Sequence, residues 1–422
     1  MIKNFIVTIV IASYFFAYTV NNLNLTYDRY SPQFLYLSII NIISIGFILR
    51  KYSAKKFLNL FVKSNPILLY TAFIITSGVS IIVAENQIES IIVFSQYLTF
   101  FFTLLVVYVL SKELTTDFVK LLFSFCVISL VLESSYILSI LFEKLYINGE
   151  EFTRSNDYRG FTANINITAF SLVIKSPVLL FFIFKSNKLL NKFLLLFLLT
   201  AVTSCLFILL SRASFIAFAF TLFLICLYAI INNMDKRLLK TSMIVFAILI
   251  SYSFMNYALN TKDSSIISDR ISSIQVDTED QSINERLRFY KAALYSISKH
   301  PILGIGIGNW KIESIKYDSK YMGGYRIPFH AHNDFLQITA ESGIISLLFF
   351  LSFLFYPFFN FIKKKIYKQN NFYYFTLLIM IVTYIIDSLL NFPISRPISH
   401  VFLIFIMVAF IGLFNNNERE NI

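Results

Sequence analysis

The sequence predicts an all-α, polytopic membrane protein with about twelve transmembrane helices. Of its 422 residues, 57% are hydrophobic and only 14% are charged, whereas an ordinary soluble domain is about 25% charged. The apolar residues also form long continuous runs, and a membrane-spanning helix needs about 20 such residues. This composition excludes a cytosolic enzyme, a disordered chain and a disulfide scaffold.

The apolar runs place the expected helices in order along the chain. Their expected ranges are 4–20, 33–50, 66–84, 88–110, 117–142, 164–185, 191–210, 213–232, 239–258, 343–361, 372–390 and 398–415. The first run is interpreted as a span, because no small-residue cleavage site precedes Asn21. Three regions follow: spans 1–9 (1–258), a large polar loop (259–342), and spans 10–12 with a tail (343–422).

The basic residues predict the orientation. Lys and Arg gather after the second, sixth, eighth and tenth expected spans, and such loops face the cytoplasm. Both termini are then cytoplasmic, and the loop 259–342 faces outward. These loops account for the net charge of +12, so no nucleic-acid role is expected.

The outward loop holds the candidate chemistry. It carries three of the four histidines, His300, His330 and His332. Residues 284–299 have helical apolar spacing and predict a helix that ends before Pro301. The GIGIGN segment (304–309) lacks the sixth-position glycine of a nucleotide loop, which favours a tight turn.

A metal site is the alternative use of the paired histidines. Asp334 and Glu341 follow His330 and His332, and all four are possible ligands. No third ligand stands at a recognisable spacing, so no metal and no cofactor are expected. The other interpretation is that one histidine orients the helix that follows.

Charged residues within apolar runs are costly and therefore informative. Arg212 divides a long apolar run, which places it at an outward turn between two spans. It is interpreted there either as an anchor that snorkels to the membrane interface or as an anion site for a lipid phosphate. Glu133 and Lys175 are expected to form a buried ion pair, and a substrate or ion pathway is the alternative. Arg286 and Arg288 lie two residues apart on a helix, so only one can share the face of Tyr290.

Several segments together resemble the O-antigen ligase and Wzy-type polymerase superfamily of bacterial envelope glycosyltransferases. They are YRGFTANIN (158–166), LLSRAS (209–214), ERLRFYKAAL (285–294), KHPILGIGIGNW (299–310), HAHNDFLQITAESG (330–343) and DSLLNFP (387–393). The family's ligase motif ends on a glycine where this chain has Ser346.

The resemblance implies a reaction and a set of residues. Such proteins move a glycan from undecaprenyl diphosphate to an acceptor hydroxyl at the outer face of the inner membrane, without nucleotide or metal. Arg212 and Arg286 would hold the diphosphate and His332 would take the acceptor proton. The implied substrate-binding residues are Arg159, Arg288, Tyr290, His330 and Asn333.

Three functions stay open from the sequence. An O-antigen ligase that acts on lipid A–core is slightly favoured over a repeat-unit polymerase of O-antigen or capsular polysaccharide. A lipid-linked oligosaccharide flippase, supported by Glu133, Lys175 and Pro177, is the alternative of another class. The expected partners are the lipid-linked glycan donor, the lipid A–core or glycan acceptor, and membrane lipids.

Overall fold

The computed structural model is helical wherever it describes the chain, which confirms the predicted all-α class. It describes residues 2–20, 30–53, 61–62, 64–114, 117–162, 164–259, 266–272, 281–318, 328–364 and 371–419, and no strand occurs among them. Every expected apolar run forms a helix in these residues.

Ten helices in the described ranges are long and apolar enough to cross a membrane. They are α2 (Ser31–Lys51), α4 (Asn65–Val79, extended by a 3-10 turn, Ser80–Val83), α5 (Gln87–Ser111), α6 (Phe118–Phe142), α7 (Ile165–Lys185), α8 (Leu189–Leu209), α9 (Arg212–Ile231), α10 (Arg237–Leu259), α14 (Asp334–Lys363) and α15 (Phe372–Leu390). The first and last expected spans are shorter: α1 (Ile2–Phe15) has 14 residues, and the apolar part of α16 (Pro397–Arg419) ends at Leu413. The count of twelve spans therefore stays a prediction.

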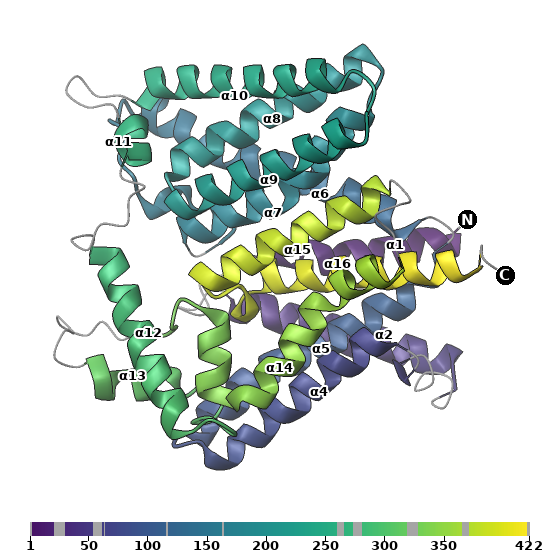
Figure 1. Cartoon of the computed structure of the whole chain (residues 1–422), viewed down its shortest axis with the longest axis vertical. Coiled ribbons are helices and arrows are strands. Elements are labelled where there is room, and N and C mark those ends of the chain that lie inside the picture. The colour runs from purple at the N-terminus through teal and green to yellow at the C-terminus, as the bar shows by residue number, and fades with distance from the viewer. Residues whose placement is uncertain are drawn as a thin grey trace. The chain divides into compact units, whose positions relative to one another are not determined.

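The chain folds into two compact units. The first unit comprises Met1–Phe118, Val276–Ile366 and Tyr384–Ile422. Within it, α14 packs on α4 and α16 packs on α5, while α12 (Gln281–Lys299) packs on α14 and on α13 (Trp310–Asp318) (Figure 1). The expected loop helix is therefore present and ends before Pro301.

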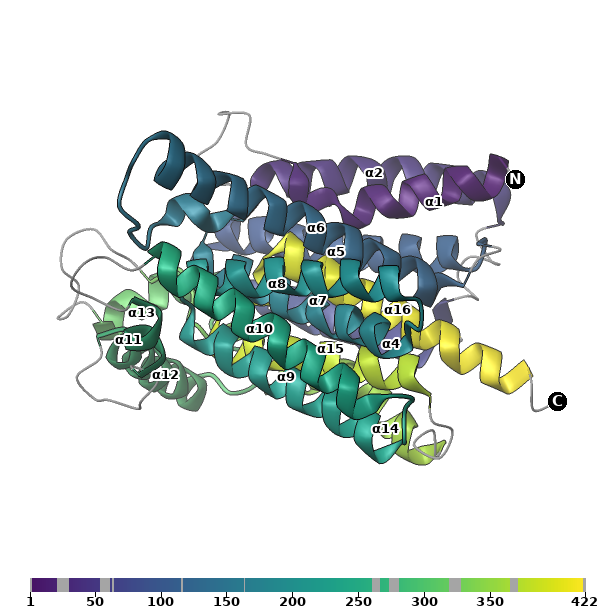
Figure 2. The ribbon, with the colours of Figure 1, turned by 90° about the horizontal axis from the view of Figure 1, so that it is seen from above.

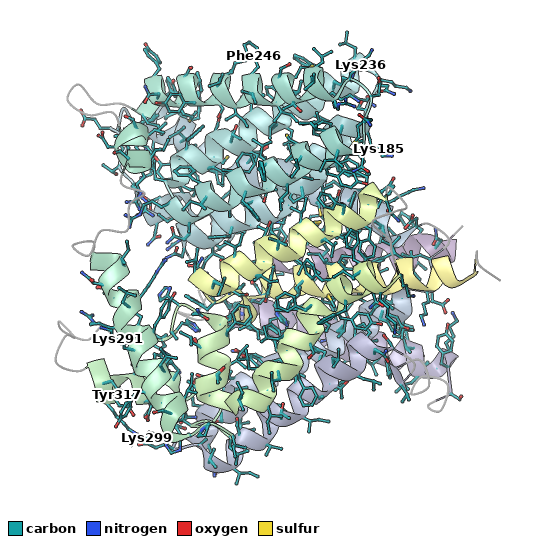
Figure 3. All side chains as sticks on the ribbon, in the orientation of Figure 1. Lys185, Lys236, Phe246, Lys291, Lys299 and Tyr317 are labelled. Atoms are coloured by element: carbon teal, nitrogen blue, oxygen red, sulfur yellow. The ribbon has the colours of Figure 1, made fainter. Side chains whose placement is uncertain are left out.

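The second unit comprises Val119–Gln275 and Tyr367–Thr383. Its central helix is α7, which α8 and α9 contact, and α10 lies along α8 (Figure 2). Phe246 of α10 points away from this unit with 65% of its surface exposed, as expected for a lipid-facing residue (Figure 3).

The second unit also contains the expected buried ion pair. Lys175 contacts Glu133, and the side chains are 2% and 3% exposed. Ser129 and Ser171 each donate a hydrogen bond of 2.8 Å to the Glu133 carboxylate. The charges inside the apolar bundle thus satisfy one another, as a structural role requires.

The start of α14 differs from the prediction. The expected span began at residue 343, but the helix begins at Asp334 and is interrupted at Gly343, whose φ of 80° and ψ of 171° are not helical. Residues 334–342 form a separate helical segment, which hydropathy alone does not reveal because Asp334 and Glu341 are polar yet buried.

Candidate active site

A glycine-rich turn supports the interrupted helix α14. The break at Gly343 redirects the Ile344 amide, which donates to the Pro301 carbonyl at 2.9 Å. The α14 carbonyls left without helical donors accept hydrogen bonds from the turn instead, Ala340 from Ile305 and Glu341 from Gly306, each at 2.9 Å.

The close approach of the two segments explains a glycine at position 343. A Cβ atom there would lie 1.8 Å from the carbonyl oxygen of Ile302, and the φ of 80° is unfavourable for any other residue. The far end of the turn is fixed by Asn309, which accepts a hydrogen bond from the Asn86 amide at 2.9 Å. The segment is a packed turn, in agreement with the sequence prediction.

The glycine-rich turn thereby positions residues 330–333, the HAHN segment, at the start of α14. Asn333 caps the helix, since its side chain accepts a hydrogen bond of 3.1 Å from the Leu336 amide. His332 precedes the cap with a φ of 56°, a left-handed conformation that non-glycine residues rarely adopt. Such strain is often concentrated at functional sites.

The ring of Phe392 contacts the rings of both His330 and His332. The His330 ring stacks on Phe392 with centroids 3.7 Å apart. The His332 ring is nearly perpendicular to Phe392, with centroids 5.1 Å apart. The guanidinium of Arg396 lies 3.5 Å from the centre of the same ring. Two groups at stacking distance must occupy opposite faces, so Phe392 lies between His330 and Arg396.

The environment keeps both imidazoles neutral. Burial, together with the positive charges of Arg286 and Arg396, lowers the pKa of His332 from 6.5 to about 4. Burial and the charge of Arg396 lower the pKa of His330 well below its usual value. At neutral pH each ring therefore has a nitrogen able to accept a proton.

Helix α12 presents Arg286 and Tyr290 to this histidine. The Tyr290 hydroxyl lies 3.1 Å from the carbonyl oxygen of His332 and 3.0 Å from that of Leu389. Burial raises the Tyr290 pKa, and the nearby charge of Arg286 opposes that rise. Arg286 thus acts electrostatically on both His332 and Tyr290. Arg288 is half-buried rather than fully solvated.

Arg212 and Arg159 belong to the second unit. The chain turns sharply between α8 and α9 at Leu210, whose φ is 47°, and Arg212 opens α9. This is the predicted turn between two spans. Arg159 ends a short 3-10 helix, and its carbonyl accepts hydrogen bonds from the hydroxyls of Thr162 and Thr168.

Two further arginines, which the sequence did not single out, lie at the same turn. Arg154 donates to the Leu209 carbonyl at 3.4 Å, and Arg270 donates to the Leu210 carbonyl at 2.9 Å. Partial burial of the guanidinium, and then the charges of Arg270 and Arg212, lower the Arg154 pKa to about 10. Three positive charges therefore gather where α9 begins, and a helix N-terminus also favours anions.

Arg396 is another arginine that the sequence analysis did not single out. It is 5% exposed, its Nε atom has no hydrogen-bond partner, and it forms no ion pair within the described residues. An arginine between two apolar runs is itself a signal that could have identified it.

No group of three or more His, Cys, Asp or Glu side chains in the described ranges is arranged to hold a metal ion. The residues brought together at His332 are instead cationic and aromatic.

The comparisons agree with the motifs. The family profile described as O-antigen ligase (Wzy_C) matches residues 193–351, from α8 into α14. This range includes Arg212, Arg286 and the HAHN segment. None of the curated proteins matches the chain significantly. The match confirms the resemblance and, with the apolar helices, supports a multi-pass membrane glycosyltransferase of the ligase or polymerase type.

Proposed function

We propose, from the match of residues 193–351 to the O-antigen ligase family profile, that the protein transfers a glycan from undecaprenyl diphosphate to an acceptor hydroxyl. The reaction takes place at the periplasmic face of a bacterial inner membrane, with both termini in the cytoplasm. The acceptor is lipid A–core, which makes the protein an O-antigen ligase, and repeat-unit polymerase is the alternative.

The proposed step is a direct displacement with inversion. The acceptor oxygen attacks the anomeric carbon and forms the new glycosidic bond, while the bond from that carbon to the diphosphate breaks. The hydroxyl proton passes to His332, and the diphosphate leaves with the bonding electron pair. Two neighbouring phosphates then carry extra negative charge, which arginine can neutralise in a bidentate manner without a metal.

The observation that carries this proposal is the contact of α12 with His332: the Tyr290 hydroxyl lies 3.1 Å from the His332 carbonyl oxygen, and Arg286 shares the helix face of Tyr290. The charge of Arg286 also lowers the pKa of His332, which keeps the imidazole neutral. A neutral imidazole is a suitable proton acceptor, and a fixed cation beside it suits an anionic leaving group. The assignment of Arg212 to the same diphosphate rests on the sequence resemblance. Arg159, Arg288, His330, Tyr290 and Asn333 bind or orient the substrates.

The departure from the ligase motif at Ser346 fits the packing of α14. Ser346 is completely buried, and its hydroxyl donates to the Ser342 carbonyl of the same helix at 2.9 Å. The substitution is therefore accommodated inside α14, away from the side chains that surround His332.

A deletion strain tests the function. We expect loss of all lipid A-linked glycan and accumulation of lipid-linked polymer on an envelope glycolipid gel, with restoration by the wild-type gene. Core that carries a single repeat unit would instead identify a polymerase. Lipid-linked glycan trapped on the cytoplasmic side would contradict both and favour a flippase.

Purified protein tests the chemistry. In liposomes with donor and acceptor, we expect transfer to continue after EDTA treatment, because the arginines supply the charge. Loss of transfer on chelation and recovery with Mg²⁺ or Zn²⁺ would contradict the arginine mechanism.

A further inference from the structure

The first unit contains a cavity beside His330. Its volume is about 450 Å³, which falls within the usual range for small-molecule sites. The walls come from the start of α2, from α5, from the start of α13 and from α14. His330 lines this cavity, and the base assigned above, His332, does not.

Two polar residues of α5, Gln96 and Tyr97, line the cavity. The Gln96 amide makes no hydrogen bond with the described part of the chain, and neither does the Tyr97 hydroxyl. Tyr97 is 6% exposed as a whole, and it lines this cavity. A polar group in such a wall is costly unless a ligand or water completes it.

The part of the cavity wall that α14 forms adds further hydrogen-bond donors and acceptors. Gln337 accepts a hydrogen bond from the Ala331 amide at 3.0 Å. Its Nε2 atom lies 3.4 Å from Glu341 Oε1 and 3.5 Å from His330 Nδ1. A saturated lipid chain would offer no hydrogen-bond partner to Gln96 and Tyr97, so the lining does not suit a lipid tail.

The charge balance of the lining does not suit a phosphate. Lys311 is paired with Glu89 at 2.5 Å and lies over the ring of Phe329. Glu341 adds a second carboxyl group to the wall. Phe329 also keeps 61% of its surface exposed, which leaves an aromatic face available to a ligand.

Amide, hydroxyl and carboxyl groups beside an aromatic face match the chemistry of a sugar ring. Sugar hydroxyls both donate and accept hydrogen bonds, and the C–H groups of one ring face pack on aromatic rings. We propose that this cavity binds an uncharged sugar residue of a substrate glycan, with Gln96 and Tyr97 as specificity-determining residues. The link to transfer rests on the proposed function, and the sugar belongs either to the acceptor or to the donor.

Binding can be measured through the single tryptophan of the chain. Trp310 is buried. In the sequence it stands between Gly308 and Lys311, and both of these residues line the cavity. Purified full-length protein is titrated with glucose, galactose and N-acetylglucosamine while its fluorescence is recorded. We expect saturable binding of at least one sugar. The absence of a saturable response to all three would overturn the proposal.

Matched variants locate the binding. Gln96→Leu and Tyr97→Phe should each weaken binding by about 3- to 10-fold, the usual effect of one lost hydrogen bond. Ser95→Ala on the same helix is the control, because Ser95 is exposed and bonds only to its own helix at Ile92. Equal affinities in all three variants, at unchanged thermal stability, would overturn the proposal, and so would displacement of the sugar by inorganic phosphate.

Kinetics then identify the source of the sugar. In the transfer assay, Gln96→Leu should raise the KM of one substrate by about 3- to 10-fold and change kcat by less than about threefold. A rise in the acceptor KM assigns the cavity to the acceptor glycan, and a rise in the donor KM assigns it to the donor glycan. Unchanged values for both would overturn the link to transfer. Sugar binding without any transfer by the wild type would contradict the proposed function alone.

Discussion

At the residue scale, the properties of His332 are set by its neighbours. A base with a pKa of about 4 drives proton transfer weakly. The lowering arises from burial and from the positive charges of Arg286 and Arg396. In the proposed reaction, a bound diphosphate offsets the charge of Arg286. Substrate binding would then strengthen the base at the moment when it is needed.

The first prediction concerns pH. Because only neutral His332 accepts a proton, kcat/KM should fall as the pH drops through its pKa, with the acid limb near pH 4 rather than 6.5. Removing a positive charge favours the imidazolium, so Arg396→Gln should move the acid limb upward, while Arg396→Lys should move it less. A wild-type acid limb near 6.5 would contradict the lowered pKa of His332, and an acid limb unchanged in Arg396→Gln would contradict the influence of Arg396 on this histidine.

The second prediction separates the loop arginines. Arg286→Ala should lower the transfer rate by on the order of 10²-fold, because a charge-assisted contact to the leaving group is lost. Arg286→Lys should also transfer glycan slowly, because the compact ammonium group of lysine does not replace the planar guanidinium, which binds phosphate in a bidentate manner. His332→Ala should be equally damaged, whereas His330→Ala should retain measurable transfer.

The control lies on the same helix: the exposed Lys291→Ala should stay within about fivefold of wild type. Arg288→Ala should lose less activity than Arg286→Ala, because Arg288 does not share the helix face of Arg286 and Tyr290. All variants are first checked for normal insertion into the membrane. An inactive Arg288→Ala beside an active Arg286→Ala would mean that the assigned face of α12 is wrong.

The sequence analysis named Arg286 and His332 as candidate site residues, but it did not name Arg396. Helical spacing alone pairs Arg286 with Tyr290, because positions four apart share a face. The position of Arg396 against Phe392, by contrast, depends on how the last two helices pack. No local periodicity contains that information.

At the element scale, α14 and the glycine-rich turn are hydrogen-bonded to each other and together hold the HAHN segment in place. The break in α14 exposes backbone groups that the turn satisfies, so neither segment is stable in this form without the other. The strained conformation of His332 is maintained by this pairing and by the cap at Asn333.

The third prediction tests this support. Gly343→Ala places a Cβ atom against Ile302 in an unfavourable backbone conformation, and should cost roughly 2–4 kcal/mol of stability. The thermal unfolding midpoint in detergent should fall, and transfer should fall with it. Gly46→Ala in α2 is the control, because nothing lies within 4 Å of its added Cβ. That variant should be neutral or slightly stabilised. Equal midpoints for the two variants would contradict the proposed support.

Hydropathy predicted the long helices correctly because an apolar span is a local property of the sequence. It placed the start of α14 too late, since residues 334–342 contain buried polar groups that the turn and the neighbouring helices satisfy. The glycine spacing predicted a turn, but not the helix that the turn supports.

At the scale of the whole molecule, the basic residues predict how the chain is oriented in the membrane. Lys185 and Lys236 lie at one end of the second unit, opposite the end that carries α11 (Figures 1 and 3). This clustering fits the rule that lysines mark cytoplasmic loops. The cysteines Cys126 and Cys205 are buried and Cys226 is partly so, which favours labelling experiments with introduced cysteines.

The fourth prediction tests the orientation. In intact spheroplasts, Lys299→Cys should react with a membrane-impermeant maleimide and Lys236→Cys should not, although both positions are exposed. After lysis both should react, which controls for accessibility. The reverse pattern would place the candidate active site in the cytoplasm and exclude the proposed reaction.

The division into two units has a consequence for biosynthesis. The second unit is built almost entirely from one continuous stretch, whereas the first needs three stretches that reach the end of the chain. The ribosome makes His332 before Phe392 and Arg396, so the surroundings of this histidine form only when the final helices have entered the membrane. A nascent or truncated chain therefore lacks the completed site, and activity begins with the finished protein.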